Sequence, residues 1–374
     1  ELNKFKKHVG FGNLITYPSR LALLCWRLLI SYNPGNHGNW TVRGKRINNV
    51  TGIFEAEVIA KMLDLYHADS KSFEGYFTSG ATEANIFSAW LGRNQIQREL
   101  GQNAKIVLHQ TDLTHYSIKK AADVVGVASV CVGIRADWQG MDAKSLSAVL
   151  NQLYKDGVRG YLLPLTLGFS LTGTDDDVSV LTKKIENFST EHPDALFFVW
   201  IDAALAGMVH PFSKTSFTPL KNPMIQTFIV DFHKFSKTPL PAGLILYRKI
   251  LRTLIEKPID YLTEKDNTLL GSRTGISPVA VWSNIEYMGK EGYGKLVRSN
   301  LEKKNRFIET YIKQKDLEII TSPHNLSLAI IIHRKKEYWS QLFKTKYDIF
   351  FKDVSVTFST GVKKLYIGKA YFVQ

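Results

Sequence analysis

The sequence has few cysteines and only short apolar runs. Its two cysteines, Cys25 and Cys131, each lie in an apolar stretch, which argues against a disulfide framework or a cysteine-based metal site. A reducing cytoplasm is therefore the expected setting. The most apolar early stretch, residues 21–26, is followed by Arg27 and is too short to span a bilayer. Its position does not suit a signal peptide either, so we expect a buried helix and no membrane partner.

Acidic residues are in deficit. The 34 Asp and Glu against 48 Lys and Arg give a formal net charge of +14. Such a charge is compatible with nucleic acid, an anionic surface or an anionic small molecule as the partner. The basic residues are spread along the chain and concentrate toward its C-terminal third. There is no Arg-rich arm and no zinc-finger spacing, so we expect no nucleic-acid partner and no metal ion.

The chain is long enough for two packed domains. Its 374 residues, 44% of them hydrophobic, supply a sizeable core. Apolar strands alternate with amphipathic helices from about residue 105 to residue 247, and several strands are apolar throughout. This pattern predicts an α/β fold with a mostly parallel sheet covered on both faces. From Pro278 onward long helices and short strands take over. We expect an N-terminal arm (1–50), a large domain (51–285) and a smaller C-terminal α+β domain (286–374).

Polar side chains follow four of the expected strands. His115, Thr166 and Asp202 come after three of them, and the pair His233-Lys234 follows a fourth. Ligands of open α/β sheets bind beyond the carboxyl ends of the strands, so these groups are expected at one rim. Residues 79–82, Ser-Gly-Ala-Thr, precede a helix, where free N–H groups and the helix dipole favour a phosphate.

Together these groups match the needs of pyridoxal phosphate. That cofactor requires a lysine amine, a carboxylate at its ring nitrogen, a phosphate site and a flat group against its ring. A carboxylate keeps the ring nitrogen protonated because a nearby negative charge favours the cationic form. Each feature has an ordinary alternative on its own, such as a helix cap or a surface lysine. Their combination predicts a pyridoxal-phosphate site.

Six segments resemble, in order, motifs of the group II pyridoxal-phosphate decarboxylases of fold type I. That family includes bacterial histidine, plant serine and archaeal tyrosine or aspartate decarboxylases. The resemblance runs from about residue 49 to residue 293 and is weaker beyond. The matching segments are residues 75–85 (GYFTSGATEAN), 115–122 (HYSIKKAA), 166–175 (TLGFSLTGTD), 202–204 (DAA), 231–243 (DFHKFSKTPLPAG) and 271–275 (GSRTG).

The resemblance implies a role for each matching residue. Lys234 would form the Schiff base and move protons, Asp202 would pair with the ring nitrogen, and His115 would stack on the ring. The remaining cofactor contacts implied by the resemblance are Gly80, Ala81, Thr82 and His233 at the phosphate, Thr166 near the phenolic oxygen and Ala204 beneath the ring. The resemblance also implies a homodimer with its sites near the subunit interface.

Three positions depart from the family pattern. Phe169 and Ser170 replace a pair of threonines, and Asp231 stands where many relatives carry Ser or Asn in contact with the phosphate. An aspartate does not favourably face a phosphate at short range, so other donors are expected to hold it.

The expected activity is decarboxylation of an L-amino acid to its amine. Another pyridoxal-phosphate reaction, by a carbon–carbon lyase or an aminotransferase, is the first alternative, and a non-catalytic basic binding protein is the second. Retention of both Lys234 and Asp202 argues against the second alternative. The substrate is open. Candidate substrate contacts are His37, Trp40, Arg273 and Ser327.

Overall fold

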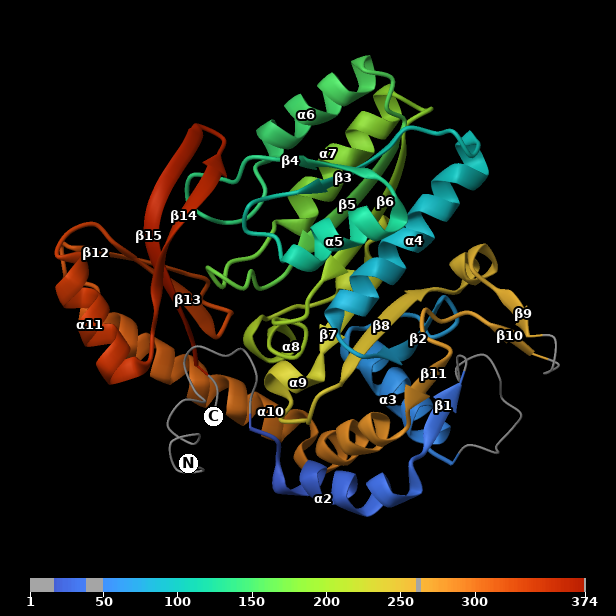
Figure 1. The fold of residues 1–374 in the computed structure, drawn as a ribbon, viewed down its shortest axis with the longest axis horizontal. Helices are drawn as coiled ribbons and strands as arrows, with labels where there is room; N and C mark the ends of the chain where they lie inside the picture. Colours follow the sequence, from blue (N-terminus) through green and yellow to red (C-terminus); the bar gives the residue numbers. More distant parts are fainter. Residues whose placement is uncertain (1–16, 38–49, 260–263, 373–374) are drawn as a thin grey trace.

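A seven-stranded sheet forms the centre of the computed structural model, which describes residues 17–37, 50–259 and 264–372 (Figure 1). The strand order is β2-β8-β7-β6-β5-β3-β4. Neighbours from β7 to β4 pair in parallel, and β8 is antiparallel to both β7 and β2. The strands are β2 (Phe73–Thr78), β3 (Ile106–Gln110), β4 (Ala128–Cys131), β5 (Gly160–Thr166), β6 (Leu196–Asp202), β7 (Ile225–Asp231) and β8 (Gly243–Arg248). The expected mostly parallel α/β sheet is confirmed.

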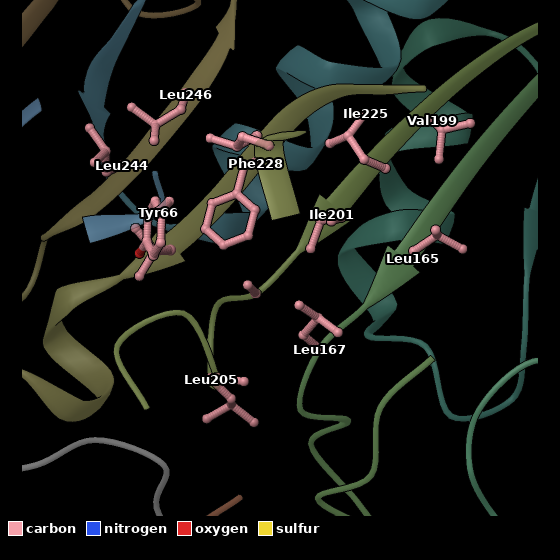
Figure 2. Close-up of a cluster of buried hydrophobic side chains, with 14 of the residues drawn as sticks. Tyr66, Leu165, Leu167, Val199, Ile201, Leu205, Ile225, Phe228, Leu244 and Leu246 are labelled. Atoms are coloured by element: carbon pink, nitrogen blue, oxygen red, sulfur yellow. The ribbon is translucent and has the colours of Figure 1, made fainter. Parts of the chain in front are cut away.

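Helices cover both faces of this sheet, which explains why its strands are apolar throughout. In β6, Phe198 and Trp200 pack toward α4 (Ala81–Leu100) and α5 (Tyr116–Val125). Val199 and Ile201 face the opposite layer, part of which Figure 2 shows. Helices on that side are α3 (Gly52–Leu65), α6 (Ala143–Lys155), α7 (Val178–Glu191), the short α8 (His210–Ser213) and α10 (Ile276–Tyr311). A further short helix, α9 (Phe232–Phe235), follows β7 directly.

A second, antiparallel sheet lies in the C-terminal part, in the order β12-β13-β15-β14 (Figure 1). Its strands are β12 (Leu317–Thr321), β13 (Ser327–Ile332), β14 (Phe351–Phe358) and β15 (Gly361–Tyr371), and α11 (Lys336–Tyr347) packs on it. The sequence did not predict α11, because only Trp339 and Phe343 of this helix are buried and its apolar pattern is sparse. This α+β arrangement is the smaller C-terminal unit that was expected.

The small sheet also contacts the large one through loops. Ile367 of β15 and Ala329 of β13 share an apolar cluster with Leu113 and Phe169, which lie close in sequence to the expected site residues His115 and Thr166. The proposed boundary between residues 285 and 286 falls inside α10, close to a kink at Gly289, where φ is 59°. The three-part division of the chain stays a prediction.

The N-terminal helix α2 (Arg20–Leu29) lies along α10. The sequence predicted a buried helix at residues 21–26. The helix is present, but the prediction that it is buried is wrong for the single chain. Only Ala22 is buried, whereas Leu24 and Leu28 are 51% and 60% exposed. The reason is that the helix packs through one side only and leaves much of its apolar surface uncovered.

The remaining short strands of the described residues form antiparallel pairs. Strand β1 (Gly35–His37) pairs with β11 (Ser272–Thr274), and β9 (Lys257–Ile259) pairs with β10 (Glu264–Asp266). Three 3-10 turns span Ile30–Tyr32, Pro219–Lys221 and Lys249–Leu254. Within the described ranges, no helix is both long enough and apolar enough to cross a membrane.

Candidate active site

The expected site residues converge at the carboxyl ends of β5, β6 and β7. The N-terminus of α4 and the start of α5 close the same pocket. The pocket is lined by Ala81, His115, Thr166, Gly168, Ser170, Asp202, Ala204, Leu205 and Lys234. Six of these nine residues were predicted from the sequence, and Gly168, Ser170 and Leu205 are additions.

Asp202 is held in one orientation at the base of the pocket. It is buried, and its Oδ1 accepts a hydrogen bond from the Ala204 amide at 3.1 Å. Its Oδ2 accepts one from Asn85 Nδ2 at 2.8 Å. The Asn85 amide is fixed in turn because its Oδ1 accepts from Trp200 Nε1 at 2.9 Å. A carboxylate anchored in this way has a fixed direction, which is what pairing with a cationic ring nitrogen requires.

His115 is connected to the same network. Its Nδ1 lies 2.8 Å from the Ser117 hydroxyl, which accepts from Asn85 Nδ2 at 3.0 Å. Burial lowers the pKa of His115, and the charge of Asp202 only partly offsets this effect. Nδ1 accepts a hydrogen bond from the Ser117 amide at 3.3 Å, so a neutral ring carries its proton on Nε2. A flat, uncharged imidazole at this point suits stacking on an aromatic ring.

Sequence reasoning missed Asn85 and Ser117 as site residues. Both lie inside segments that were recognised, at residues 75–85 and 115–122, but nothing in their spacing indicated that one amide links Asp202 to Ser117. The hydrogen bond between Asn85 and Asp202 joins residues 117 positions apart in the chain. It therefore depends on how α4 packs against β6.

Lys234 lies in α9 beside two other titratable groups. Its Nζ is 3.1 Å from Asp231 Oδ2, and His233 Nε2 is 3.5 Å from the same oxygen. His233 Nδ1 lies 3.1 Å from the Ala242 carbonyl oxygen. Burial lowers the pKa of His233. The lysine thus lines the pocket, while Asp231 and His233 lie behind it.

The expected phosphate turn lies at the N-terminus of α4. Gly80 precedes the helix with a φ of 152°, a conformation that favours glycine. A Cβ on Gly243 would come within 2.6 Å of Gly80 Cα, so the turn packs directly on β8. Glu83 accepts from the Ser79 amide at 2.7 Å and fixes the turn. The first N–H groups of a helix have no partner within the helix, which makes this end of α4 suitable for an anion.

Thr166 is fixed by an aspartate that the sequence pattern did not select. The Thr166 amide donates to Asp176 Oδ2 at 2.6 Å, and Asp176 is the residue after the matching segment 166–175. Asp175 instead accepts from the Gly168 amide and from Asn325, each at 2.8 Å. Both aspartates therefore shape the loop that lines the pocket.

Two of the four candidate substrate residues, Arg273 and Ser327, lie away from the pocket lining. Arg273 is buried, with Nη1 2.6 Å from Glu55 Oε1 and 3.0 Å from the Phe77 carbonyl oxygen. Ser327 is buried at the start of β13 and lies against Gly173. His37 belongs to β1, but its side chain is outside the description, and Trp40 lies outside the described residues. The structure thus brings neither Arg273 nor Ser327 into the pocket.

Lys369 of β15 is a basic residue near the site that sequence reasoning missed. Burial lowers the pKa of its amine, and the positive charges of Lys352 and Lys234 lower it further. Its charge also acts on His115. No motif marks Lys369, because the small sheet brings it to the site from the end of the chain.

The residues present fit pyridoxal phosphate by their chemistry. They provide a lysine amine, an anchored carboxylate, a neutral imidazole and a helix N-terminus around one pocket. The free space within the pocket is only ≈10 Å³, about what is needed to admit a single water. Lining side chains such as Lys234 must therefore move to admit a cofactor. The site matches pyridoxal phosphate in the chemistry of its donor groups, not in the size of its cavity.

The fold and this set of groups define a fold type I pyridoxal-phosphate enzyme. A family profile, "Pyridoxal-dependent decarboxylase conserved domain", matches residues 49–334. The chain belongs to this pyridoxal-dependent decarboxylase family, and its cofactor is pyridoxal 5'-phosphate.

Individual relatives agree with this assignment. A probable L-aspartate decarboxylase of Pyrococcus abyssi is 29% identical over 83% of this chain and 76% of its own length. A tryptophan decarboxylase of Clostridium sporogenes is 25% identical over a segment that covers 64% of this chain and 57% of that protein. The chain thus spans little more than half the length of that relative. The crystal structure of L-methionine decarboxylase from Streptomyces sp. 590 has a TM-score of 0.80 at 18% identity, over 100% of this chain and 89% of that one.

The Arg273–Glu55 pair gives a first prediction. Glu55→Gln removes the carboxylate charge that pairs with the buried Arg273 cation and should lower the free energy of unfolding by about 3 kcal/mol, measured by urea denaturation. The control Asp64→Asn breaks an ion pair with Lys290 in which both side chains are 71% exposed. It should cost about 0.5 kcal/mol or less. Equal effects of the two variants would contradict a supporting role for Arg273.

Proposed function

We propose that the protein decarboxylates an L-amino acid to the corresponding amine and carbon dioxide. The observation that carries this proposal is the convergence of Lys234, Asp202 and His115 on one pocket. Bound pyridoxal phosphate supplies an electron sink for the carbanion that remains when carbon dioxide leaves. The residues of the chain bind the cofactor, orient it and move protons.

Each side chain has a role that its position supports. Lys234 would hold the cofactor as a Schiff base and, as an amine of the same pocket, would return a proton to the substrate. Asp202 keeps a proton on the ring nitrogen, and such a preorganised charge is often the largest catalytic contribution. His115 would stack on one face of the ring and Ala204 would lie beneath the other, where a small side chain leaves room.

The phosphate is assigned to the N-terminus of α4, with Gly80, Ala81 and Thr82 as the turn and His233 beside it. The Thr166 hydroxyl is assigned to the ring near its phenolic oxygen. The buried network through Asn85 and Ser117 keeps Asp202 and His115 in register with each other. A pocket this enclosed also excludes water, which favours loss of carbon dioxide.

The substrate is best identified directly. Incubation of the purified protein and pyridoxal phosphate with each common amino acid should release carbon dioxide and amine from at least one of them. Keto-acid formation instead of carbon dioxide would favour an aminotransferase. Absence of a visible absorbance band after cofactor addition would favour the non-catalytic alternative.

Lys234→Ala tests the attachment point. The variant should lose the imine that borohydride traps, together with nearly all turnover, because no other amine lines the pocket among the described residues. Lys237→Ala, three residues further along the chain, is the matched control and should keep both properties. Labelling of another lysine in the Lys234→Ala protein would show the assignment to be wrong.

Asp202→Asn tests the electrostatic role. The change removes the charge at nearly constant volume, so kcat should fall by about 10²–10³-fold while cofactor still binds. Asp194→Asn, beyond the opposite end of the same strand, should leave kcat unchanged. Near-normal turnover of the Asp202→Asn protein would refute the role assigned to this carboxylate.

We also propose that the active unit is a homodimer. The exposed apolar residues of α2 and the turn that follows it support this, because a single chain leaves them uncovered: Leu23, Leu24, Leu28, Ile30 and Tyr32. An obligate two-fold interface buries more than about 2,000 Å² in total, which such a surface can help to supply.

Sedimentation at low micromolar concentration measures the assembly. The wild-type protein should be a dimer, and Leu24→Glu combined with Leu28→Glu should shift it toward monomers, because two charges would be buried at the interface. Tyr338→Glu, an equally exposed position on α11, should stay dimeric. A wild-type protein that is monomeric and fully active would refute this proposal.

A further inference from the structure

Asp231 places a buried negative charge directly behind the cofactor lysine. It ends β7, immediately before α9, and its side chain is 3% exposed. Its Oδ2 lies 3.1 Å from Lys234 Nζ and 3.5 Å from His233 Nε2. Its Oδ1 is buried and accepts no hydrogen bond from the part of the chain that the structure describes. One carboxylate oxygen is therefore paired, while the other has no donor.

The unpaired oxygen lies against the turn that precedes α4. A Cβ built on Gly80 would lie 3.8 Å from Asp231 Oδ1 and 3.4 Å from His233 Cε1. A Cβ on Gly243 would lie 2.9 Å from the same oxygen. The carboxylate is thus packed between the Gly80 turn and β8, beside the helix N-terminus to which the phosphate is assigned. An anion bound there has Asp231 as an immediate neighbour.

The surrounding charges compensate Asp231 only in part. Lys234 and His233 contact it, and its charge also acts on His115 of α5. Burial lowers the pKa of both histidines, which leaves Lys234 as the main positive charge at this carboxylate. That same amine is the group expected to bind the cofactor. Two negative groups, Asp231 and a phosphate, would then share one compensating cation.

We propose that Asp231 acts as a built-in competitor of the cofactor phosphate and weakens the binding of pyridoxal phosphate to this protein. The inference rests on the proposed function, which assigns the phosphate to the N-terminus of α4. It goes further by giving Asp231 a definite effect on affinity. Removal of this one charge tightens the site.

Titration of the cofactor-free protein tests the proposal without any measurement of turnover. Wild-type and Asp231→Asn proteins are titrated with pyridoxal phosphate, with binding followed by equilibrium dialysis and by the visible absorbance band. Asp231→Asn keeps the volume and removes the charge, so its Kd should be lower by about tenfold. Asp194→Asn changes the net charge equally, far from the pocket, and should leave the Kd within about twofold of wild type.

Pyridoxal, which lacks the phosphate, separates the possible causes. If Asp231 acts on the phosphate, Asp231→Asn should leave the Kd of pyridoxal within about twofold of the wild-type value. Equal tightening for pyridoxal and pyridoxal phosphate would overturn the proposal, because Asp231 would then act through the Lys234 amine. Weaker binding of pyridoxal phosphate by Asp231→Asn would overturn it as well. If the wild-type protein does not bind pyridoxal phosphate at all, the proposed function itself is refuted.

Discussion

A sheet that is buried on both faces favours apolar side chains along its strands and leaves most of its polar groups to the strand ends. In β6, Phe198 and Trp200 pack on one layer of helices and Val199 and Ile201 on the other. The first position free of this constraint is Asp202. The same holds for β5, which ends in Thr166, and for β7, which ends in Asp231. Because parallel strands end at one edge, apolar packing by itself collects these groups at a common rim.

The groups collected there need partners, since an unpaired buried charge is costly. Asn85 supplies a donor to both Asp202 and Ser117, so one amide orients the carboxylate and, through Ser117, the imidazole of His115. Lys234 offers the compensating charge for Asp231. The site is therefore a small set of mutually dependent charges and hydrogen bonds, and a change in one alters the others.

The C-terminal sheet contributes to the site from outside. Its apolar face packs on Phe169 and Leu113, close to the residues that line the pocket. The alternation along β15 then brings Lys369 to the same side as the buried Ile367. The charge around the pocket thus depends on contact between two parts that are far apart in the sequence.

The sequence by itself determined the α/β class and the residues at the strand ends. Apolar runs, helical spacing and short motifs are local signals, so Lys234, Asp202, His115 and the Gly80 turn could be identified from them. It could not reveal that β8 is antiparallel, because an apolar strand has the same pattern in either direction.

Tertiary structure alone decided the contacts between distant residues. It joins Arg273 to Glu55, 218 positions away in the chain. It also leaves α2 largely exposed and brings Lys369 near Lys234. Each of these outcomes depends on which surfaces pack together. A local pattern of residue types does not contain that information, because the same arginine or apolar helix is compatible with several partners.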